Sequence, residues 1–461
     1  MTSEPISTVP ASLTTTLFFL SLLILMILAL ALEEKIHAKK SIIVGLVAII
    51  CLVIATPIHI VPFGNVILPN HHELDIPVYI TAVDWGVIAI ILGSSIFVDV
   101  TSRSGLFTWI AIRLTKLSKG DPLKLLWYYS LMTVIFSAVL NNVTAMIIVG
   151  SLSAVSLAKL GREKLLFGFL LTEGLLTNVG GLLTLISSVP NIIVGNTAGL
   201  TFIEFFIKSS PFVAVATVAT VILAARLFNI ARLKEETQLA KAAELIAGFD
   251  ENDGIESRGF FWFSAGMLIL FVITIASTPV LPIAHQLGMG FVALTFAALM
   301  LIHYKSKVDE FYKAVDWDLL AFFVALFIVI NVMEDADVLK FIGKGITLLI
   351  GEHESQFGSS ALLIASALTS SVTDNIPLSA MLAKILAASH TVKDSPLWWS
   401  VIFGANLGGN VTPIGSASTL VAVTIMHKNN IKISFFGFIK IASLFAALQI
   451  VLALLYLLVF I

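Results

Sequence analysis

Polar residues interrupt two of the chain's long apolar stretches near their middle. Residues 125 to 158 contain Asn141-Asn142-Val143-Thr144, and residues 359 to 390 contain Thr373-Asp374-Asn375-Ile376-Pro377. A side-chain amide in apolar surroundings is costly unless it has a hydrogen-bonding partner. We therefore expect each stretch to be two helices that meet at a polar tip. The tips predict a substrate site, with Na⁺ as a candidate ligand there, formed by Asn141, Asn142, Thr144, Thr373, Asp374, Asn375 and Pro377.

A second pair of polar motifs contains adjacent glycines. Asn178-Val179-Gly180-Gly181 precedes Ser187-Ser188-Val189-Pro190-Asn191, and Asn406-Leu407-Gly408-Gly409 precedes Gly415-Ser416-Ala417-Ser418-Thr419. Glycine permits a membrane helix to unwind, and the exposed helix ends can then hold anions at N-termini and cations at carbonyl groups. Small residues in membrane helices also mediate close packing, which is the competing interpretation for Thr184, Ser187 and Ser418. The predicted ion-binding residues are Asn178, Gly180, Gly181, Ser187, Ser188, Asn191, Asn406, Gly408, Gly409, Thr412 and Ser416.

Two acidic residues within apolar stretches are candidates for coupling transport to a cation. Glu173 lies five residues before Asn178, and Asp374 lies at the second tip. Ionisable groups inside a membrane are functional candidates, because a carboxyl group there can exchange a proton for a metal ion. For Asp374 the alternative is a structural hydrogen bond at the tip. Asp99, near the end of an apolar run, is a weaker candidate.

These motifs lie in a chain whose composition excludes several classes of protein. The 461 residues are 58% hydrophobic and 12% charged, whereas a soluble domain has about 25% charged residues. A formal net charge of −2 lacks the basic excess of nucleic-acid-binding proteins, so we expect no nucleic-acid partner. Zincin, nucleophile-elbow and nucleotide-binding motifs are absent from the sequence. We therefore expect a membrane protein that is neither an enzyme nor a cofactor carrier.

Hydropathy predicts ten membrane crossings, at about 20 apolar residues each. We place both interrupted stretches as re-entrant hairpins and the N-terminus outside, because Lys and Arg in short loops then fall mainly on the cytoplasmic side. A charged insertion at 231–258 is the predicted cytoplasmic linker between two halves, 1–230 and 259–461. The predicted crossings are 13–32, 41–59, 84–101, 165–200, 205–228, 259–278, 286–303, 316–335, 396–425 and 434–461.

The two halves carry the same landmarks in the same order. Asp84-Trp85 matches Asp316-Trp317 at an offset of 232 (316 minus 84), and the hairpin tips 125–158 and 359–390 match at 233 (Asn375 minus Asn142). The Asn-x-Gly-Gly motifs match at 228 (406 minus 178). Five crossings per half is an odd number, so the second half must enter the membrane from the opposite side. The sequence thus predicts an all-α polytopic protein of two inverted repeats, each with a re-entrant hairpin and a broken helix, 165–200 and 396–425.

At these motifs the chain resembles the ion transporter superfamily, with its citrate-transporter-like domain. The stretch from Phe136 to Asn196 and the stretches Asp374–Pro377 and Gly404–Ser416 resemble the branch that contains arsenite permeases (ArsB), NhaD-type sodium/proton antiporters and the P protein. The resemblance implies an elevator-type transporter, a homodimer, whose site is lined by Asn142, Thr144, Asn375 and the Asn178 and Asn406 motifs. Relatives usually have Gly-Asp-Pro-Pro-Asn where this chain has Ser187-Ser188-Val189-Pro190-Asn191, so their ion stoichiometry does not transfer directly.

The motifs and the resemblance together predict a secondary active transporter, multi-pass in the cytoplasmic membrane. Polar amides and helix ends suit a small anion or oxyanion, with arsenite among the candidates, coupled to Na⁺ or H⁺. The alternative is an NhaD-type Na⁺/H⁺ antiporter in which Asp374 and Glu173 exchange the two cations. A channel would instead need a continuous water path.

Overall fold

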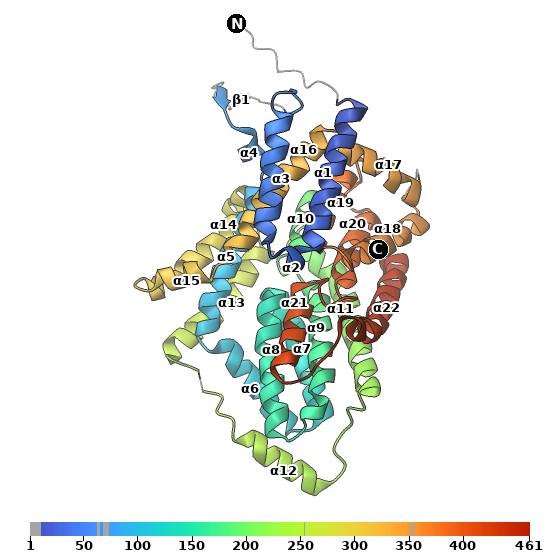
Figure 1. Ribbon diagram of the computed structural model, residues 1–461. Coiled ribbons are helices and arrows are strands. Elements are labelled where there is room, and N and C mark those ends of the chain that lie inside the picture. The colour runs from blue at the N-terminus through green and yellow to red at the C-terminus, as the bar shows by residue number, and fades with distance from the viewer. Residues whose placement is uncertain (1–10, 62–64, 68–72, 253, 352–354) are drawn as a thin grey trace.

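The computed structural model describes residues 11–61, 65–67, 73–252, 254–351 and 355–461. It is almost entirely helical (Figure 1), as predicted. The elements are α1 Leu13–Ala31, α2 Glu33–Ile36, α3 Lys40–Ala55, β1 Asn65–Ile67, β2 Glu73–Asp75, α4 Val78–Thr81, α5 Trp85–Arg103, α6 Leu106–Ser118, α7 Pro122–Val139, α8 Asn142–Lys159, α9 Leu166–Gly181, α10 Val189–Ala198, α11 Phe202–Leu227, α12 Glu236–Ala247, α13 Arg258–Ala276, α14 Pro282–Leu301, α15 Val308–Ala314, α16 Trp317–Asp335, α17 Val338–Ile350, α18 Gln356–Ser370, α19 Asn375–Ala388, α20 Pro396–Gly408, α21 Ala417–Lys428 and α22 Phe435–Phe460, with short 3₁₀ helices at Glu163–Leu165 and Ile302–Tyr304. β1 and β2 pair as an antiparallel ribbon.

Nine helices among the described residues are long and apolar enough to cross a membrane. They include α7 and α8, which the sequence analysis places in a hairpin. Only Leu140 and Asn141 separate these two helices, which pack side by side, so the chain reverses between them. The predicted crossing at 41–59 corresponds to the shorter α3, and the crossings at 165–200 and 396–425 are each two helices with a break between them.

The Asp-Trp pairs begin equivalent helices by the same contacts. Asp84 accepts a hydrogen bond from the Val87 amide at 3.1 Å and thereby caps α5, while Asp316 caps α16 in the same way through Leu319 at 3.0 Å. An aspartate at this position satisfies an amide that the first helical turn leaves unpaired. In both halves the tryptophan indole then donates to the carbonyl five residues before it. The repeated dipeptide is therefore a repeated helix start.

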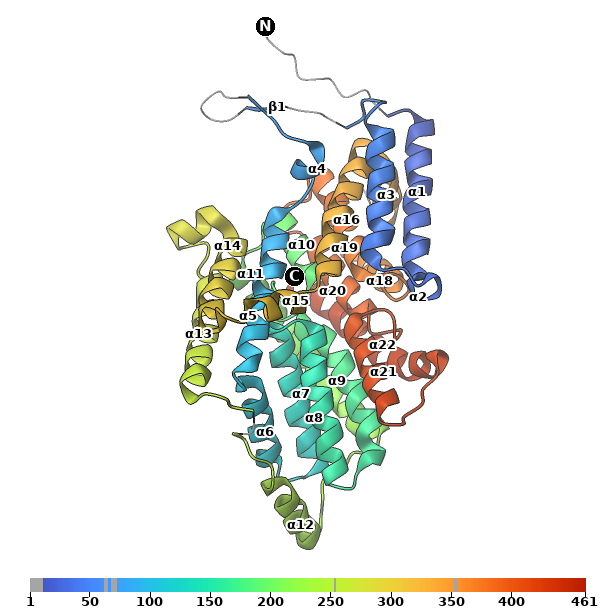
Figure 2. The ribbon, with the colours of Figure 1, turned by 60° about the vertical axis from the view of Figure 1, so that its left-hand side comes forward.

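The helices form two packing groups. We call the first group the frame; it consists of α1, α3, α5, α13, α14 and α16. Its helices pack most extensively in two pairs, α14 with α5 and α3 with α16. The core, our name for α7–α11 and α18–α22, contains both hairpins and both broken helices. Figures 1 and 2 show α7, α8 and α9 in the lower part of the molecule and α10, α19 and α16 above them. α6 and α17 contact both groups and connect them.

Core packing exchanges elements between the two halves. The second part of one broken helix, α21, packs on the first hairpin at α8, and its counterpart α10 packs on the second hairpin at α19. Close approach depends on matched glycines: a Cβ on Gly180 would lie 2.7 Å from the Val134 carbonyl oxygen, and one on Gly408 would lie 2.2 Å from that of Ala367. Both distances are too short for any side chain. At these two positions the absence of a side chain therefore serves the close packing of neighbouring helices.

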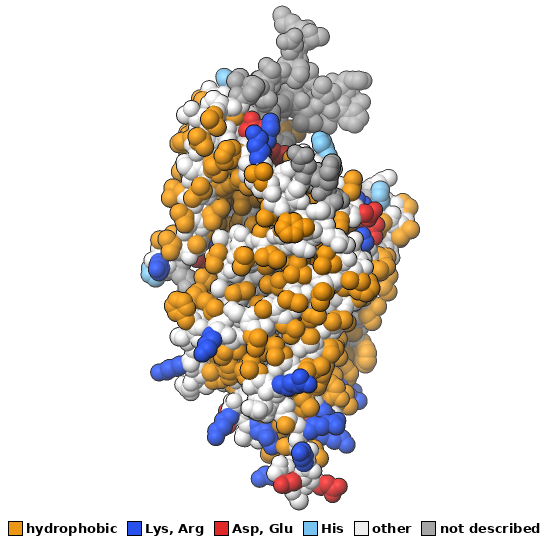
Figure 3. Space-filling view, turned by 90° about the vertical axis from the view of Figure 1, so that its right-hand side faces the viewer, with side chains coloured by type: hydrophobic (Ala, Val, Ile, Leu, Met, Phe, Trp, Pro, Cys, Tyr) orange, Lys and Arg blue, Asp and Glu red, His pale blue; other side chains and the backbone are white. Residues whose placement is uncertain are grey.

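The molecular surface agrees with a membrane location. The face in Figure 3 is covered by hydrophobic side chains over its middle, while Lys and Arg side chains gather toward its lower end. The linker helix α12 lies at that lower end in Figure 1. The cytoplasmic position of the linker stays a prediction.

Candidate substrate and ion site

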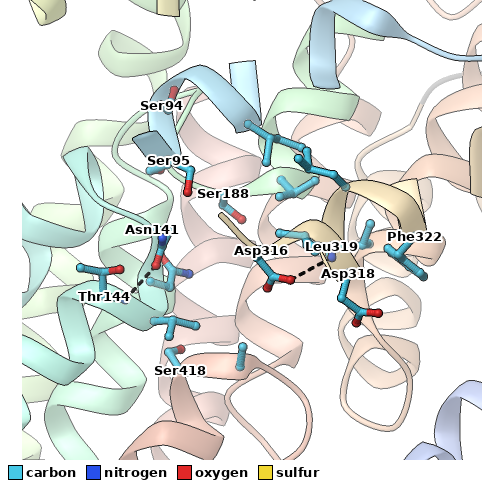
Figure 4. A pocket seen from close by; sticks show the side chains of 18 of the residues that line it. Ser94, Ser95, Asn141, Thr144, Ser188, Asp316, Asp318, Leu319, Phe322 and Ser418 are labelled. Atoms are coloured by element: carbon cyan, nitrogen blue, oxygen red, sulfur yellow. Dashed lines mark hydrogen bonds between the residues drawn. The ribbon is translucent and has the colours of Figure 1, made fainter. Parts of the chain in front are cut away.

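Four helix N-termini converge on one cavity of about 830 Å³. α8 and α19 begin there at the two hairpin tips, and α10 and α21 begin there after the breaks of the two broken helices. The lining residues from these helix starts are Asn141, Asn142, Val143, Thr144, Ser187, Ser188, Val189, Pro190, Asn375, Ile376, Ser416, Ala417 and Ser418. In Figure 4, Asn141, Thr144, Ser188 and Ser418 lie to one side, with Asp316 and Asp318 of α16 to the other.

Local sequence explains why the helices start at the cavity. Asn141 accepts the Thr144 amide at 2.8 Å, Asp374 accepts the Ile376 amide at 3.0 Å, and Ser416 accepts the Thr419 amide at 3.3 Å. These are N-cap contacts, which satisfy one amide each and leave others of the first turn available. Ser188 differs, because its side chain makes no cap hydrogen bond to α10.

Asn178 is the centre of an amide network that joins the two halves. Its Nδ2 donates to Asn410 Oδ1 and to Ser416 Oγ, both at 2.8 Å. Its Oδ1 accepts from Asn142 Nδ2 and from Ser418 Oγ, both at 3.2 Å. Asn178 therefore ties the first hairpin tip to the start of α21, and its side chain is buried.

Asn406 holds the equivalent place in the second half. Ser188 Oγ donates to Asn406 Oδ1 at 2.8 Å, and Asn406 Nδ2 donates to Asn191 Oδ1 at 2.9 Å and to the Ile402 carbonyl at 2.8 Å. The Asn406–Ser188 contact repeats the Asn178–Ser416 contact at the same offset of 228 (406 minus 178, 416 minus 188). Each amide thus bonds to the break in the opposite half.

Hydroxyl groups attach each hairpin tip to its neighbouring broken helix in the same register. Ser137 donates to the Thr177 carbonyl and Ser370 to the Ala405 carbonyl, both at 2.6 Å. In a second matched set the donors lie in the breaks and the acceptors lie in the hairpins, and the donors are two threonines. Thr184 donates to the Ala138 carbonyl at 2.6 Å, and Thr412 donates to the Ser371 carbonyl at 2.7 Å.

The carbonyl groups of the first break, where the sequence predicts cation binding, already accept side-chain hydrogen bonds. Asn191 Nδ2 donates to the Gly181 and Thr184 carbonyls at 2.7 and 3.1 Å. Ser187 Oγ donates to the same two carbonyls. A cation could replace the Asn191 amide only if that side chain moved. These residues hold the break in its present shape.

The two predicted coupling carboxylates have different surroundings. Glu173 is fully buried in α9, away from the cavity lining, and Ser153 Oγ donates to its Oε1 at 2.5 Å. Its Oε2 has no hydrogen-bonding partner among the described residues. Asp374 instead forms an ion pair with Lys40, the first residue of α3, which itself lines the cavity.

Not every predicted site residue reaches the cavity. Asp374 lies outside the lining, Thr373 donates to the Thr369 carbonyl of the preceding helix α18 at 2.8 Å, and Pro377 is buried in α19. The other predicted binding residues outside the lining lie within the core packing around it: Gly180, Gly181, Asn191, Asn406, Gly408, Gly409 and Thr412.

Sequence reasoning missed several residues of the site. Lys40 is one of these, because no local pattern indicates a partner 334 positions later. Gln449 accepts from Asn410 Nδ2 at 2.7 Å and donates to Thr220 at 3.0 Å, which anchors the amide network to α22 and α11. A lone glutamine in a 26-residue apolar helix was the available signal for it.

A helical membrane protein with hairpins and broken helices around a central cavity has the build of a secondary transporter. The chain belongs to the citrate transporter family (CitMHS), whose model matches residues 23–404. It is 31% identical over 385 residues to the uncharacterized transporter Rv2684 of Mycobacterium tuberculosis, covering 82% of this chain and 86% of that protein. It is 25% identical to the human P protein over 78% of this chain, which spans about half (51%) of that longer protein.

Two solved structures share the fold. The Alcanivorax borkumensis YdaH transporter superposes with a TM-score of 0.57 at 12% identity, covering 92% of this chain and 98% of that one. Neisseria gonorrhoeae MtrF, described as an antimetabolite efflux pump, gives a TM-score of 0.52 at 12% identity, covering 92% and 95%. The chain is therefore a secondary membrane transporter and not an enzyme, as predicted. The narrower likeness to arsenite permeases and NhaD antiporters stays a prediction.

Proposed function

We propose that the protein carries a small anion across the cytoplasmic membrane, coupled to Na⁺ or H⁺, by an elevator movement of the core against the frame. The observation that carries this proposal is the convergence of four helix N-termini and the adjoining amides on one cavity. Each N-terminus corresponds to roughly half a positive elementary charge, so the four together favour an anion.

The substrate class follows from the chemistry of the lining. First-turn amides, asparagine side chains and serine hydroxyls donate hydrogen bonds to several oxygens at once, which suits a carboxylate or an oxyanion. The family description points to citrate as the first compound to test. Arsenite and phosphate remain candidates, since each presents several oxygens to the same donors.

The elevator proposal follows from the packing groups. The matched contacts of the two halves within the core support inverted repeats, which place one hairpin tip at each side of the substrate. On the side of the core away from the main cavity, Lys384 of α19 pairs with Glu334 of α16 at 3.0 Å, and Asn196 of α10 donates to Asp84 at 2.8 Å. These polar contacts join core to frame and must break if the core slides.

A crosslink across that boundary tests the movement. Glu334→Cys with Lys384→Cys, joined by a short reducible bifunctional reagent, should stop transport until the crosslink is reduced. Glu204→Cys with Lys393→Cys is the matched control, because this pair, at 2.9 Å, joins parts of the chain on the core side. Equal inhibition by both crosslinks, or by neither, contradicts the elevator movement.

Uptake into proteoliposomes tests substrate and coupling together. Purified protein should accumulate labelled citrate, or another of the named oxyanions, when an inward Na⁺ or H⁺ gradient is imposed, and Asn142→Ala should reduce that uptake. Saturation separates a transporter from a channel. Homodimer formation, which the resemblance implies, is tested by the mass of the protein in detergent.

The alternative function is Na⁺/H⁺ exchange through Asp374 and Glu173. The buried carboxyl of Glu173, with one oxygen unpartnered among the described residues, favours it. Under this alternative, an imposed Na⁺ gradient changes the internal pH of the liposomes without any anion present. An anion transporter gives no such signal until its substrate is added.

A further inference from the structure

The tip of the second hairpin is held by a charged contact that the sequence did not predict. Asp374 Oδ2 pairs with the Lys40 ammonium, while Asp374 Oδ1 accepts the Ile376 amide at 3.0 Å. The Asp374 side chain is only 12% exposed. Within the described part of the chain, no other Lys or Arg lies within 4.0 Å of this carboxylate. Both of its oxygens are thus engaged by the protein itself.

This ion pair links the two packing groups. Lys40 begins α3, which packs along α16 and α1 in the frame, whereas Asp374 precedes α19, which packs on α10 and α20 in the core. Near Lys40, Glu33 Oε1 lies 3.8 Å from the ammonium, and Ser41 donates to Asp318. A sliding core would carry Asp374 away from Lys40.

Separation would leave the Asp374 carboxylate without its cation. An uncompensated carboxylate in surroundings of low polarity is strongly disfavoured. It would also stand beside four helix N-termini that the proposed substrate must reach, and there it would repel an anion. A cation from solution is the simplest replacement for the ammonium.

We infer that Lys40 is a built-in counter-cation that competes with the coupling cation for Asp374. This inference rests on the proposed function. When the core lies as in this structure, the Lys40 ammonium occupies Asp374 and drives Na⁺ or the proton into the adjoining solution. When the core slides away, one Na⁺ binds the carboxylate, or one proton forms its O–H bond. The Asp374 carboxylate is therefore paired with one cation at every stage. The coupling cation is released only in the position of the core in which Lys40 reaches Asp374.

The competition is between a tethered and a free cation. A group held on the same molecule acts at an effective concentration in the millimolar range or above. Lys40 therefore displaces a weakly bound Na⁺ without any further energy source. Because Lys40 acts on Asp374 and not on the substrate, it is a positioning residue for the coupling ion.

Lys40→Met tests the inference, with Lys35→Met as the matched control. Lys35 is an exposed lysine of α2, lies outside the cavity lining, and has no ion pair within 4.0 Å in the described chain. The measurement is inhibition of uptake by Na⁺, or by acid, on the inner side of right-side-out proteoliposomes. We expect Lys40→Met to be inhibited by about fivefold less internal Na⁺, or at a higher internal pH, because a partly exposed ion pair changes cation affinity by up to about that factor. Lys35→Met should behave as the parent protein does.

Two further variants keep the test decisive. Lys40→Arg retains the charge and should retain the parent's inhibition curve. Asp374→Asn removes the group for which the cations compete, so adding Lys40→Met to it should change nothing more; this comparison holds even if Lys40→Met alone folds poorly. Coupled transport whose internal inhibition is the same in Lys40→Met and Lys35→Met overturns the inference. Transport without any Na⁺ or H⁺ dependence in the parent protein instead overturns the coupling in the proposed function.

Discussion

Removal of the Asn178 side chain should weaken the core and the transport site together. Asn178→Ala deletes four hydrogen bonds that join the first hairpin tip, α9 and the start of α21. The hydroxyls of Ser416 and Ser418 can bond to each other instead, since they already lie 3.1 Å apart. Asn142 Nδ2 and Asn410 Oδ1 have no such substitute and lose their partner.

The expected cost follows from those two unpaired amide groups. Side-chain hydrogen bonds in membrane proteins contribute about 0.6 kcal/mol on average and up to about 1.7 kcal/mol. Two of them give a loss of about 1 to 3 kcal/mol in the free energy of unfolding. In a double-mutant cycle, Asn142→Ala should therefore lower the free energy of unfolding by less in the Asn178→Ala background than in the parent protein. Uptake should fall as well, because the first hairpin tip is no longer fixed at the cavity.

Unfolding in mixed detergent micelles with increasing SDS measures the free energy, and proteoliposome uptake measures the function. Asn429→Ala is the matched control, because this exposed asparagine bonds only to the Ile425 carbonyl of its own helix, at 2.9 Å. It should change the free energy of unfolding by less than about 0.5 kcal/mol. If Asn178→Ala is no more destabilising than Asn429→Ala, or if its effect is additive with Asn142→Ala, the network does not hold the site.

Three other perturbations have defined outcomes. Gly408→Ala places a methyl group 2.2 Å from a backbone oxygen of α18 and should abolish accumulation of folded protein. Gly266→Ala is the control, because its methyl group has no atom of a neighbouring element within 4 Å. The yield of each variant in detergent, measured by size-exclusion chromatography, compares them. Glu173→Gln keeps the Ser153 contact, so folding should persist while any H⁺-driven uptake is lost; unchanged H⁺-driven uptake removes Glu173 as the proton carrier. The hydrogen bond from Lys116 lowers the pKa of Glu251, so attachment of the linker through this group is complete above the ordinary glutamate range and is lost as pH falls below it. Hydrogen exchange of α12, corrected for the intrinsic exchange rate at each pH, should show reduced protection in acid, and Glu251→Gln should show the same reduced protection at neutral pH.

Much of the site could be predicted because the chain repeats its landmarks. A polar residue inside an apolar run is visible in the sequence, and a second copy at a constant offset gives it structural meaning. Asn142, Asn178, Ser188 and Asn406 were found in this way, and all four bond to another member of the predicted set. The same offsets predicted the equivalent helix starts of α5 and α16.

The residues that were missed have no matching residue type at the repeat offsets: apolar residues stand there for Lys40, and a threonine, Thr220, stands 229 positions before Gln449. Lys40 and Gln449 act through partners in other helices: the Lys40 contact depends on how the frame and core meet, and the Gln449 contacts depend on how α22 packs within the core. Periodicity and hydropathy describe single helices, so they do not report contacts between packing groups. The sequence also did not predict which polar residues bond to other protein groups and which face the cavity, because both kinds have the same sequence pattern.

That division separates residues that hold the site from residues that remain available to a ligand. Asn178 and Asn406 use both ends of their amides on protein partners, and each reaches into the opposite half. The Asn375 side chain and the Thr144 hydroxyl line the cavity and make no hydrogen bond to any described residue. Asn178 takes Ser416 and Ser418 as partners from the second half, and Asn406 takes Ser188 and Asn191 from the first. Cohesion of the core thus draws on both halves, while Thr144 and Asn375 at the two hairpin tips keep polar groups that, under the proposed function, can bind a solute from two sides.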